Sequence, residues 1–288
     1  MFAVYKRELQ SYFNSVIGYL VTAAMLLFIG IYYIFINLTY GYSSFAATLQ
    51  SVSFIFVIVI PILTMRSMAE DRKNKTDQLL LTSPVSVSSI VAGKYLSMVS
   101  VFGTVCLITC LFPVLLKSLG STKMLVSYSM ILAFFLFGCA AIAIGQFISS
   151  LTENQILACI GTVGVMLVLE LMDSISSLIP DTANGSFAGL IFLVLIAAYI
   201  ILCMTRNWII AGGTALVGCG ILTVLYVAKK SIFTGLLPNF LNSLSLSAHL
   251  NNFANEIFDV SSIVFYLSVI TVFLFLTVQT VEKRRWSR

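Results

Sequence analysis

Residues 65–86 read MRSMAEDRKNKTDQLLLTSPVS and stand between two long apolar runs. Charged side chains crowd between Arg66 and Asp77, although only 9% of the chain is charged. Ionised groups are costly to place in the hydrocarbon core of a bilayer, so this stretch must meet water. The segment 66–89 therefore marks a place where the chain leaves an apolar environment and re-enters it.

The composition of the whole chain predicts a membrane protein. Of its 288 residues, 59% are hydrophobic, and the mean hydropathy is +1.04. The surface of a soluble domain could not cover so many apolar side chains. The apolar runs predict an all-α polytopic fold in one membrane domain over 1–288, with eight spans. The expected spans are 17–36, 52–65, 90–116, 124–150, 156–172, 187–204, 208–228 and 260–281.

Three further features refine this fold. In residues 1–16, apolar residues share one helical face, which predicts an amphipathic helix lying along the membrane interface; its characteristic residues are Tyr5, Lys6, Arg7, Glu8 and Leu9.

In span 124–150, Ala141, Gly145 and Ser149 recur every four residues. Such a small-residue face allows close helix packing, either within the chain or against a second copy. The mixed segment 229–259 predicts one or two short amphipathic helices before the last span.

The basic residues predict the orientation. With eight spans, both termini lie on one side of the membrane. If that side is the cytoplasm, twelve of the 16 Lys and Arg residues are cytoplasmic. Only four lie outside, namely Lys117, Lys123, Lys229 and Lys230. The excess favours cytoplasmic termini, a cytoplasmic segment 66–89 and an extracellular segment 229–259.

The sequence contains no motif for catalysis or for nucleotide binding. It has no Gly-x-x-x-x-Gly-Lys-Ser/Thr phosphate loop, no His-Glu-x-x-His and no Gly-x-Ser-x-Gly. The six cysteines lie in apolar runs and suggest buried thiols instead of metal ligands. The scattered basic clusters do not form a nucleic-acid patch. We therefore expect neither an enzyme nor a cofactor or metal site in this chain.

One acid, Glu170, falls toward the outer end of its predicted span. A carboxylate inside the membrane would be typical of an ion-coupled carrier, whereas one at the interface would have no such role. Glu170 is therefore the candidate intramembrane acid.

The second half of the charged stretch predicts a short cytoplasmic helix. Thr76 can cap it, Asp77 complements the positive end of its dipole, and Pro84 ends it. Between them lie Gln78, Leu79, Leu80, Leu81, Thr82 and Ser83. Exposed leucines flanked by charges suit docking onto a partner protein, although a plain solvated loop is the alternative.

The same residues resemble the ABC-2 type permeases, and among them the gliding-motility and copper-processing permeases. The resemblance begins with Tyr5-Lys6-Arg7-Glu8-Leu9, Tyr12-Phe13 and Gly18-Tyr19. It continues through Pro61-Ile62-Leu63-Thr64-Met65-Arg66, Ala69-Glu70-Asp71, Thr76 to Ser86, and Ile90-Val91-Ala92-Gly93-Lys94-Tyr95. It returns in Leu246-Ser247, His249, Asn252-Phe253, Tyr266-Leu267-Ser268 and Arg285-Trp286. The chain departs from the family pattern at Lys75, where glycine is usual, and in having eight predicted spans instead of six.

The resemblance implies a permease subunit of an ATP-driven exporter in a bacterial cytoplasmic membrane. Two permease chains, identical or homologous, would form a pair. Each would be seated on a separate ABC ATPase that binds ATP and Mg. An auxiliary extracytoplasmic protein would be a further partner. The segment Asp77–Pro84 would be the coupling helix, residues 1–16 the interfacial helix and 187–228 an extra hairpin. Two alternatives stay open, namely an assembly subunit of an ATPase-driven motility or secretion machine, and an ion-coupled carrier that uses Glu170.

Overall fold

The structure, a computed structural model, describes residues 1–76, 85–120, 123–180, 182–191, 233–255 and 257–286, together with 194, 213, 218–220, 223 and 226. These residues form helices and no strand. The predicted all-α polytopic membrane fold is confirmed, because six of the described helical segments are long and apolar enough to cross a membrane.

The six segments are built from eleven helical elements. The first, Val16–Thr39, comprises α2 (Val16–Tyr32) and the π-helical η1 (Tyr33–Thr39). The second, Ala46–Lys73, comprises α3 (Ala46–Val52), the 3₁₀ turn η2 (Ser53–Ile55), α4 (Phe56–Thr64) and α5 (Ala69–Lys73). The third, Val87–Leu119, joins α7 (Val87–Thr109) to α8 (Leu111–Leu119). The others are α9 (Met124–Leu151), α10 (Gln155–Leu178) and α15 (Val260–Trp286), of which Val260–Lys283 forms the span.

These six segments correspond to six of the eight predicted spans. The other two predicted spans, 187–204 and 208–228, lie largely outside the described residues, and with them the predicted extra hairpin 187–228. The expected count of eight spans therefore stays a prediction. The mixed segment before the last span contains two short helices, α13 (Leu236–Leu244) and α14 (Leu246–Ala254), as its helical periodicity predicts.

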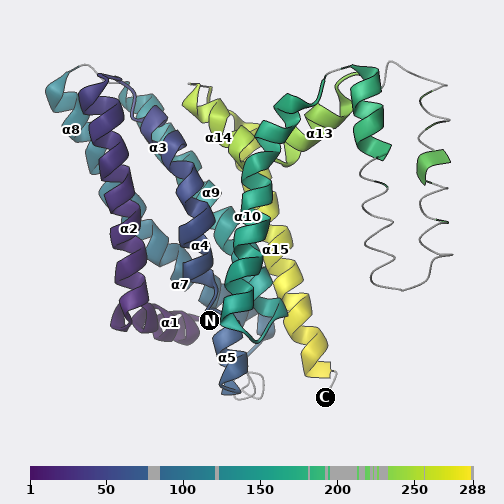
Figure 1. The fold of residues 1–288 in the computed structure, drawn as a ribbon. Coiled ribbons are helices and arrows are strands. Elements are labelled where there is room, and N and C mark those ends of the chain that lie inside the picture. Colours follow the sequence, from purple (N-terminus) through teal and green to yellow (C-terminus); the bar gives the residue numbers. More distant parts are fainter. Residues whose placement is uncertain are drawn as a thin grey trace. The chain divides into compact units, whose positions relative to one another are not determined.

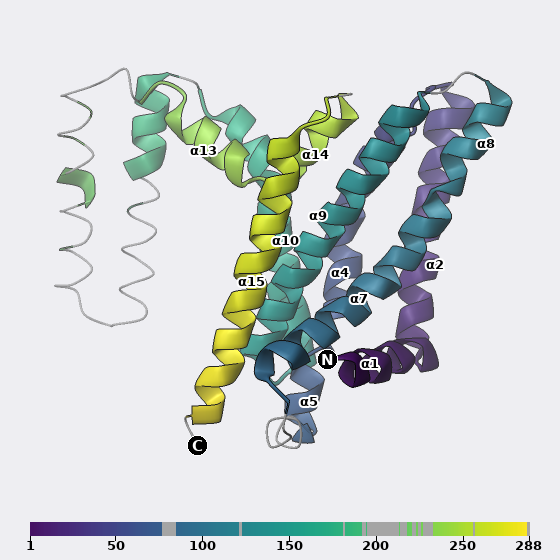
Figure 2. The same cartoon turned by 180° about the vertical axis from the view of Figure 1, so that it is seen from behind.

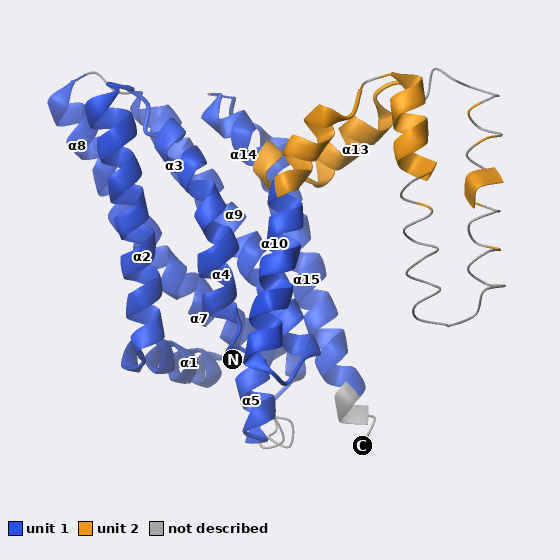
Figure 3. Cartoon of the chain, in the orientation of Figure 1, with its two compact units in different colours: residues 1–170, 249–288 blue, residues 171–248 orange. Residues whose placement is uncertain are grey.

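By internal contacts the chain divides into two units, and Figure 3 colours them separately. Unit 1 comprises residues 1–170 and 249–288, and unit 2 comprises 171–248. Within unit 2, the ring of Phe187 stacks on Tyr226 with centroids 4.4 Å apart. In the same unit, the hydroxyl of Ser176 donates to the carbonyl of Pro238 at 3.0 Å. This hydrogen bond joins the last turns of α10 to the first turn of α13.

The core of unit 1 is a cluster of phenylalanine rings at the centre of the helices. Phe56 on α4 has its ring centroid 4.8 Å from that of Phe134 and 4.9 Å from that of Phe137, both on α9. Phe102 on α7 completes the cluster, 5.5 Å from Phe56. Edge-to-face rings at these distances add favourable electrostatics to the packing of apolar surface. Helix α9 is central, since 72% of its most apolar stretch is buried, against 17% for that of α10 and for that of α15.

Helix α1 (Phe2–Asn14), helix α5 and the end of α15 lie at one end of unit 1, where the candidate site is found. In Figures 1 and 2, α1 lies across the ends of the long helices instead of running alongside them. The described part of α14 in unit 1 lies at the other end. The two chain ends thus lie on one side of unit 1, as an even number of spans requires.

Candidate functional site

The amphipathic helix α1 is docked tightly onto α7. Gly93 of α7 makes this approach possible, because a Cβ atom there would lie 3.2 Å from the carbonyl oxygen of Met1 and 3.2 Å from Cβ of Val4. The hydroxyls of Tyr5 and Ser100 lie 3.0 Å apart across the same interface. Of the other predicted interfacial residues, Lys6 and Arg7 are exposed, while Glu8 and Leu9 are half-buried. The helix therefore presents one polar face outward and packs the other against the bundle.

Tyr12 joins α1 to a second span. Its hydroxyl donates to the carbonyl oxygen of Leu63 in α4 at 3.1 Å. Burial of the side chain raises the pKa of Tyr12 well above its ordinary value, because the phenolate would lose its hydration. Tyr12 thus stays neutral and acts as a fixed hydrogen-bond donor.

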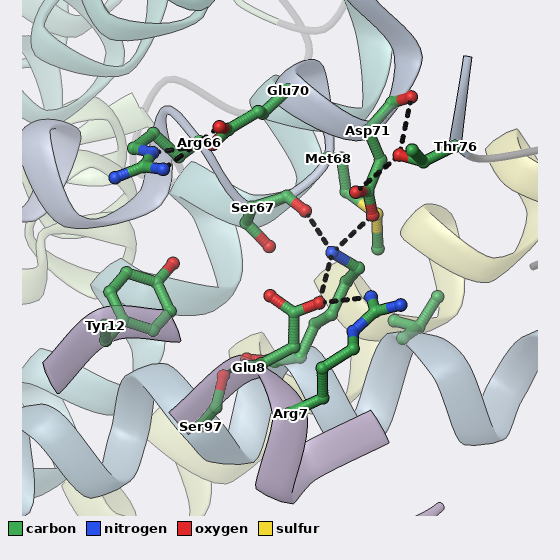
Figure 4. Close-up of polar contacts among 12 residues, drawn as sticks. Arg7, Glu8, Tyr12, Arg66, Ser67, Met68, Glu70, Asp71, Thr76 and Ser97 are labelled. Carbon is green, nitrogen blue, oxygen red and sulfur yellow. Dashed lines mark hydrogen bonds and ion pairs between the residues drawn. The ribbon is translucent and has the colours of Figure 1, made fainter. Parts of the chain in front are cut away.

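The centre of the site is the ammonium group of Lys94, whose side chain is only 3% exposed. Its Nζ atom lies 2.6 Å from Oδ2 of Asp71 and 3.2 Å from Oε1 of Glu8, and donates to the carbonyl oxygen of Ser67 at 2.7 Å (Figure 4). An ammonium has three N–H donors, and here three oxygens surround them. Two carboxylates and a carbonyl offset the desolvation of this buried cation, which costs several kcal/mol. Through it, α7 is connected to both α1 and α5.

Charged neighbours extend this lysine-centred cluster. Arg7 pairs with Glu8, with NH2 2.6 Å from Oε1, and this hydrogen bond raises the pKa of the Arg7 guanidinium. Arg66 binds Glu70 through two nitrogens, at 2.6 and 3.0 Å. Bidentate pairs of this kind fix the geometry as well as the charge. The cluster therefore holds the start of the charged stretch in one conformation.

The hydroxyl of Ser149 fastens the turn between α4 and α5 to α9. It accepts the N–H groups of Met68 and Ala69, each at 3.2 Å, and donates to the carbonyl oxygen of Met65 at 3.2 Å. One turn earlier, Gly145 faces the side chain of Thr64, and a Cβ there would collide with it. Ala141 on the same face is fully buried. The small-residue face of α9 thus packs against α4 and the following turn within the chain.

Arg72 makes a further connection to the end of α9. Its guanidinium donates to the carbonyl oxygens of Ser150 and Thr152. The last carbonyls of a helix lack partners inside the helix and carry partial negative charge, so a cation is favourable there. Next to it, Met68, Val87 and Val91 form a buried apolar cluster against Leu274, Val278 and Val281 of α15. The turn after α4 is therefore in contact with α1, α7, α9 and α15.

The predicted coupling helix itself, Asp77–Pro84, lies outside the described residues. The structure gives its two flanks. The hydroxyl of Thr76, the predicted cap, donates back to Oδ1 of Asp71 at 3.0 Å. Just before it, Lys75 has a φ of +57°, in the left-handed region that favours glycine. On the other side, the side chain of Ser86 accepts the N–H of Ser89 and begins α7.

Glu170 lies apart from this cluster. The hydroxyl of Ser53 donates to Oε1 of Glu170 at 3.0 Å, joining η2 to α10. Ser53 lies seven positions from the start of the span Ala46–Lys73, and Glu170 lies eight positions from the end of the span Gln155–Leu178, so the pair lies inside both spans and not at their ends. Among the described residues, no group of three His, Cys, Asp or Glu side chains could hold a metal ion. The site that the structure assembles around Lys94 is a junction of ion pairs and hydrogen bonds between α1, α5 and α7.

The sequence pattern identified Glu8 only as a residue of the interfacial helix, and Asp71 and Lys94 only as parts of a resemblance. It did not indicate the contacts of Ser67 and Arg72. One signal was available for Lys94, because a lysine within an otherwise apolar helix needs an acidic partner.

Comparison with known protein families gives one match. Residues 17–212, more than half of the chain, match the model of a family described as ABC-2 family transporter protein. A search of the curated proteins finds no match.

Proposed function

The chain belongs to the ABC-2 family of transporter proteins, and is thus a membrane permease of the ABC type; we propose that it forms the permease subunit of an ATP-driven exporter. The six long apolar helices support its place in the membrane. Since the sequence has no phosphate loop, ATP and Mg are bound and ATP is hydrolysed on a separate ABC ATPase chain.

The observation that carries the proposal is the buried ion cluster at Lys94. It joins the interfacial helix α1, the turn after α4 and the start of α7, and it lies directly before residues 77–84. A movement of residues 77–84 would therefore act on α1, on the turn after α4 and on α7 at the same time. In this proposal those residues dock on the ATPase, and the cluster transmits the movement to the spans. ATP binding would favour one conformation of the permease over another, which is what shifting such an equilibrium requires.

The remaining parts of the proposal follow from the charge pattern and the family. The excess of basic residues supports a cytoplasmic position for the cluster and both termini, with residues 229–259 outside. The cell membrane is bacterial, and two permease chains pair, either identical or homologous. An auxiliary extracytoplasmic protein completes such an exporter.

Co-purification tests this function. The wild-type chain and the variant Leu79→Asp with Leu80→Asp are expressed with an affinity tag in a cell that contains the cognate ATPase. We expect the wild type to retain the ATPase and the double variant to lose it, because two carboxylates would replace the apolar docking face. Ser88→Asp is the matched control, since it adds a charge to an exposed position of the first turn of α7.

Two results would contradict the proposal. The first is normal ATPase retention and normal export by the double variant. The second is export that persists without any ATPase and stops on Glu170→Gln, which would indicate an ion-coupled carrier. ATPase activity stimulated by a solute distinguishes an exporter from an assembly subunit of a motility or secretion machine.

A further inference from the structure

A polar cleft of about 300 Å³ lies beside the Lys94 cluster, between α1 and the turn that precedes α5. Figure 4 shows Arg66, Ser67, Tyr12 and Glu8 around one open space. All four line the cleft, together with Arg7 and Glu70. The coupling role proposed above uses only some of the residues that line this cleft.

Ser67 points to a ligand in this cleft. The residue is only 4% exposed, and its Oγ atom has no hydrogen-bond partner among the described residues. A buried hydroxyl without a partner costs free energy, about 1–3 kcal/mol, unless another group satisfies it. The neighbouring Arg66 is 25% exposed and Arg7 is 53% exposed, so both can present further N–H donors to the same space. Hydroxyl and guanidinium donors together are suited to a phosphate group.

The charges of the cleft favour a ligand without net charge. Its three cations, Arg7, Arg66 and Lys94, are matched by three acids, Glu8, Glu70 and Asp71. The side chains of Glu70 and Asp71 are 32% and 21% exposed. A ligand that carries both a phosphate and an ammonium group would complement both sets.

The position of the cleft in the molecule identifies the source of that ligand. Arg66 and Glu70 lie in the last turns of one spanning segment, and Lys94 in the first turns of the next. Helix α1, which forms one wall, exposes Phe2 (76%), and Val16 just beyond its end is equally exposed (76%). Apolar side chains exposed on an interfacial helix are accommodated by lipid chains. The cleft therefore lies at the depth of the lipid headgroups, which flank the hydrocarbon core.

We propose that this cleft binds the phosphoethanolamine headgroup of a membrane phospholipid. The phosphate accepts from Ser67 Oγ and the guanidinium of Arg66, and the ammonium donates to the carboxylates. A choline headgroup fits less well, because its quaternary nitrogen has no N–H, and a glycerol headgroup lacks the cation. The proposal holds whether or not an ATPase docks on residues 77–84.

Lipid titration of the purified full-length chain in detergent, followed by native mass spectrometry, tests the site. The probes are phosphatidylethanolamine, phosphatidylcholine and phosphatidylglycerol with the same acyl chains, and water-soluble phosphoethanolamine. We expect phosphatidylethanolamine to bind about tenfold more tightly than the other two lipids, because only its headgroup has an ammonium with N–H donors, and Ser67→Ala to weaken its binding about tenfold, as the loss of one hydrogen bond to a charged group would. Soluble phosphoethanolamine should bind more weakly and also depend on Ser67.

Ser127→Ala is the matched control. Ser127 is also buried with an unpartnered hydroxyl, but it lies in the first turn of α9. The turn that carries Ser67 contacts Ser149, at the other end of that helix. Ser127→Ala should leave lipid binding unchanged. Equal binding of all three lipids, or unaltered binding by Ser67→Ala, would overturn the proposal. So would soluble phosphoethanolamine binding as tightly as the lipid, or Ser67→Ala reducing retention of an ATPase while lipid binding stays the same.

Discussion

Lys94 and Asp71 form an ion pair across the junction between α7 and α5, with Nζ 2.6 Å from Oδ2. The lysine is the buried partner, and the aspartate also accepts a hydrogen bond from Thr76. The side chain of Asp71 thus connects the first turns of a span to Thr76, the last described residue before the segment 77–84. The pair thus connects the described residues just before that segment to the third spanning segment.

Removing the ammonium should destabilise the protein strongly. Lys94→Met leaves Asp71 without its buried cation and Glu8 paired with Arg7 alone, and breaking a buried pair costs about 3 kcal/mol or more. We expect a lower Tm in detergent, measured by the loss of monodisperse protein after heating. Lys117→Met, at an exposed position, serves as the control and should have little effect. Adding Glu8→Gln and Asp71→Asn to Lys94→Met should restore part of the stability; if it does not, the two carboxylates are not the cause.

Lys75→Gly should stabilise the protein by about 1 kcal/mol. Lys75 has a φ of +57°, where a side chain is strained and glycine is not. The matched variant Lys73→Gly lies in the last turn of α5 and should be destabilising, because glycine weakens a helix. A Tm comparison of the two variants measures the contrast. Equal effects of both glycines would show that the backbone conformation at 75 is not strained.

Gly93→Ala should detach α1 from α7. The new Cβ would lie 3.2 Å from both Met1 and Val4, and relieving such overpacking costs about 1–3 kcal/mol. Gly103→Ala on the same helix meets only a ring atom at 3.9 Å and should be tolerated. Labelling of a cysteine introduced at the buried Val4 measures the opening of this interface. A labelling rate unchanged by Gly93→Ala would mean that α1 does not depend on this contact.

Asp259 should make the start of α15 sensitive to acid. Its carboxylate accepts from the hydroxyl of Ser262 at 2.8 Å and from the N–H of Ser261 at 2.9 Å, and chiefly the first of these lowers its pKa below the ordinary value. The folded-state pKa is depressed, so the stability it contributes is present at neutral pH and is lost as pH falls through that pKa, below about 4. Asp259→Ala should cost about 1 kcal/mol at pH 7, as the loss of a helix cap does. The Tm difference between the two proteins should shrink toward pH 3; a constant difference would contradict the cap.

Cysteine labelling tests the orientation. In a background without native cysteines, Asn74→Cys and Asn239→Cys each place a thiol at an exposed position on either side of the expected membrane. A membrane-impermeant maleimide added to intact cells should label position 239 and spare position 74 until the cells are opened. Labelling of position 74 in intact cells would reverse the topology.

The apolar runs predict the spanning helices well, because eighteen or more apolar residues leave few alternatives to a membrane helix. The amphipathic pattern at the N-terminus likewise predicts α1. The Lys94 cluster was not predictable in the same way. Glu8 lies 86 positions from Lys94, and no local pattern indicates which distant acid neutralises a given lysine. The short turn of Met65–Met68, held by Ser149, depends equally on long-range contact with α9.

The wide spacing of Glu8 and Lys94 has a consequence for the synthesis of the protein. Helix α1 is made first, but the lysine that neutralises Glu8 emerges only with the third spanning segment. Until then the interfacial helix has neither its Gly93 contact nor its cation. A nascent chain that stops before residue 94 would therefore present an undocked amphipathic helix, and synthesis of the first turns of α7 becomes the step at which α1 can dock.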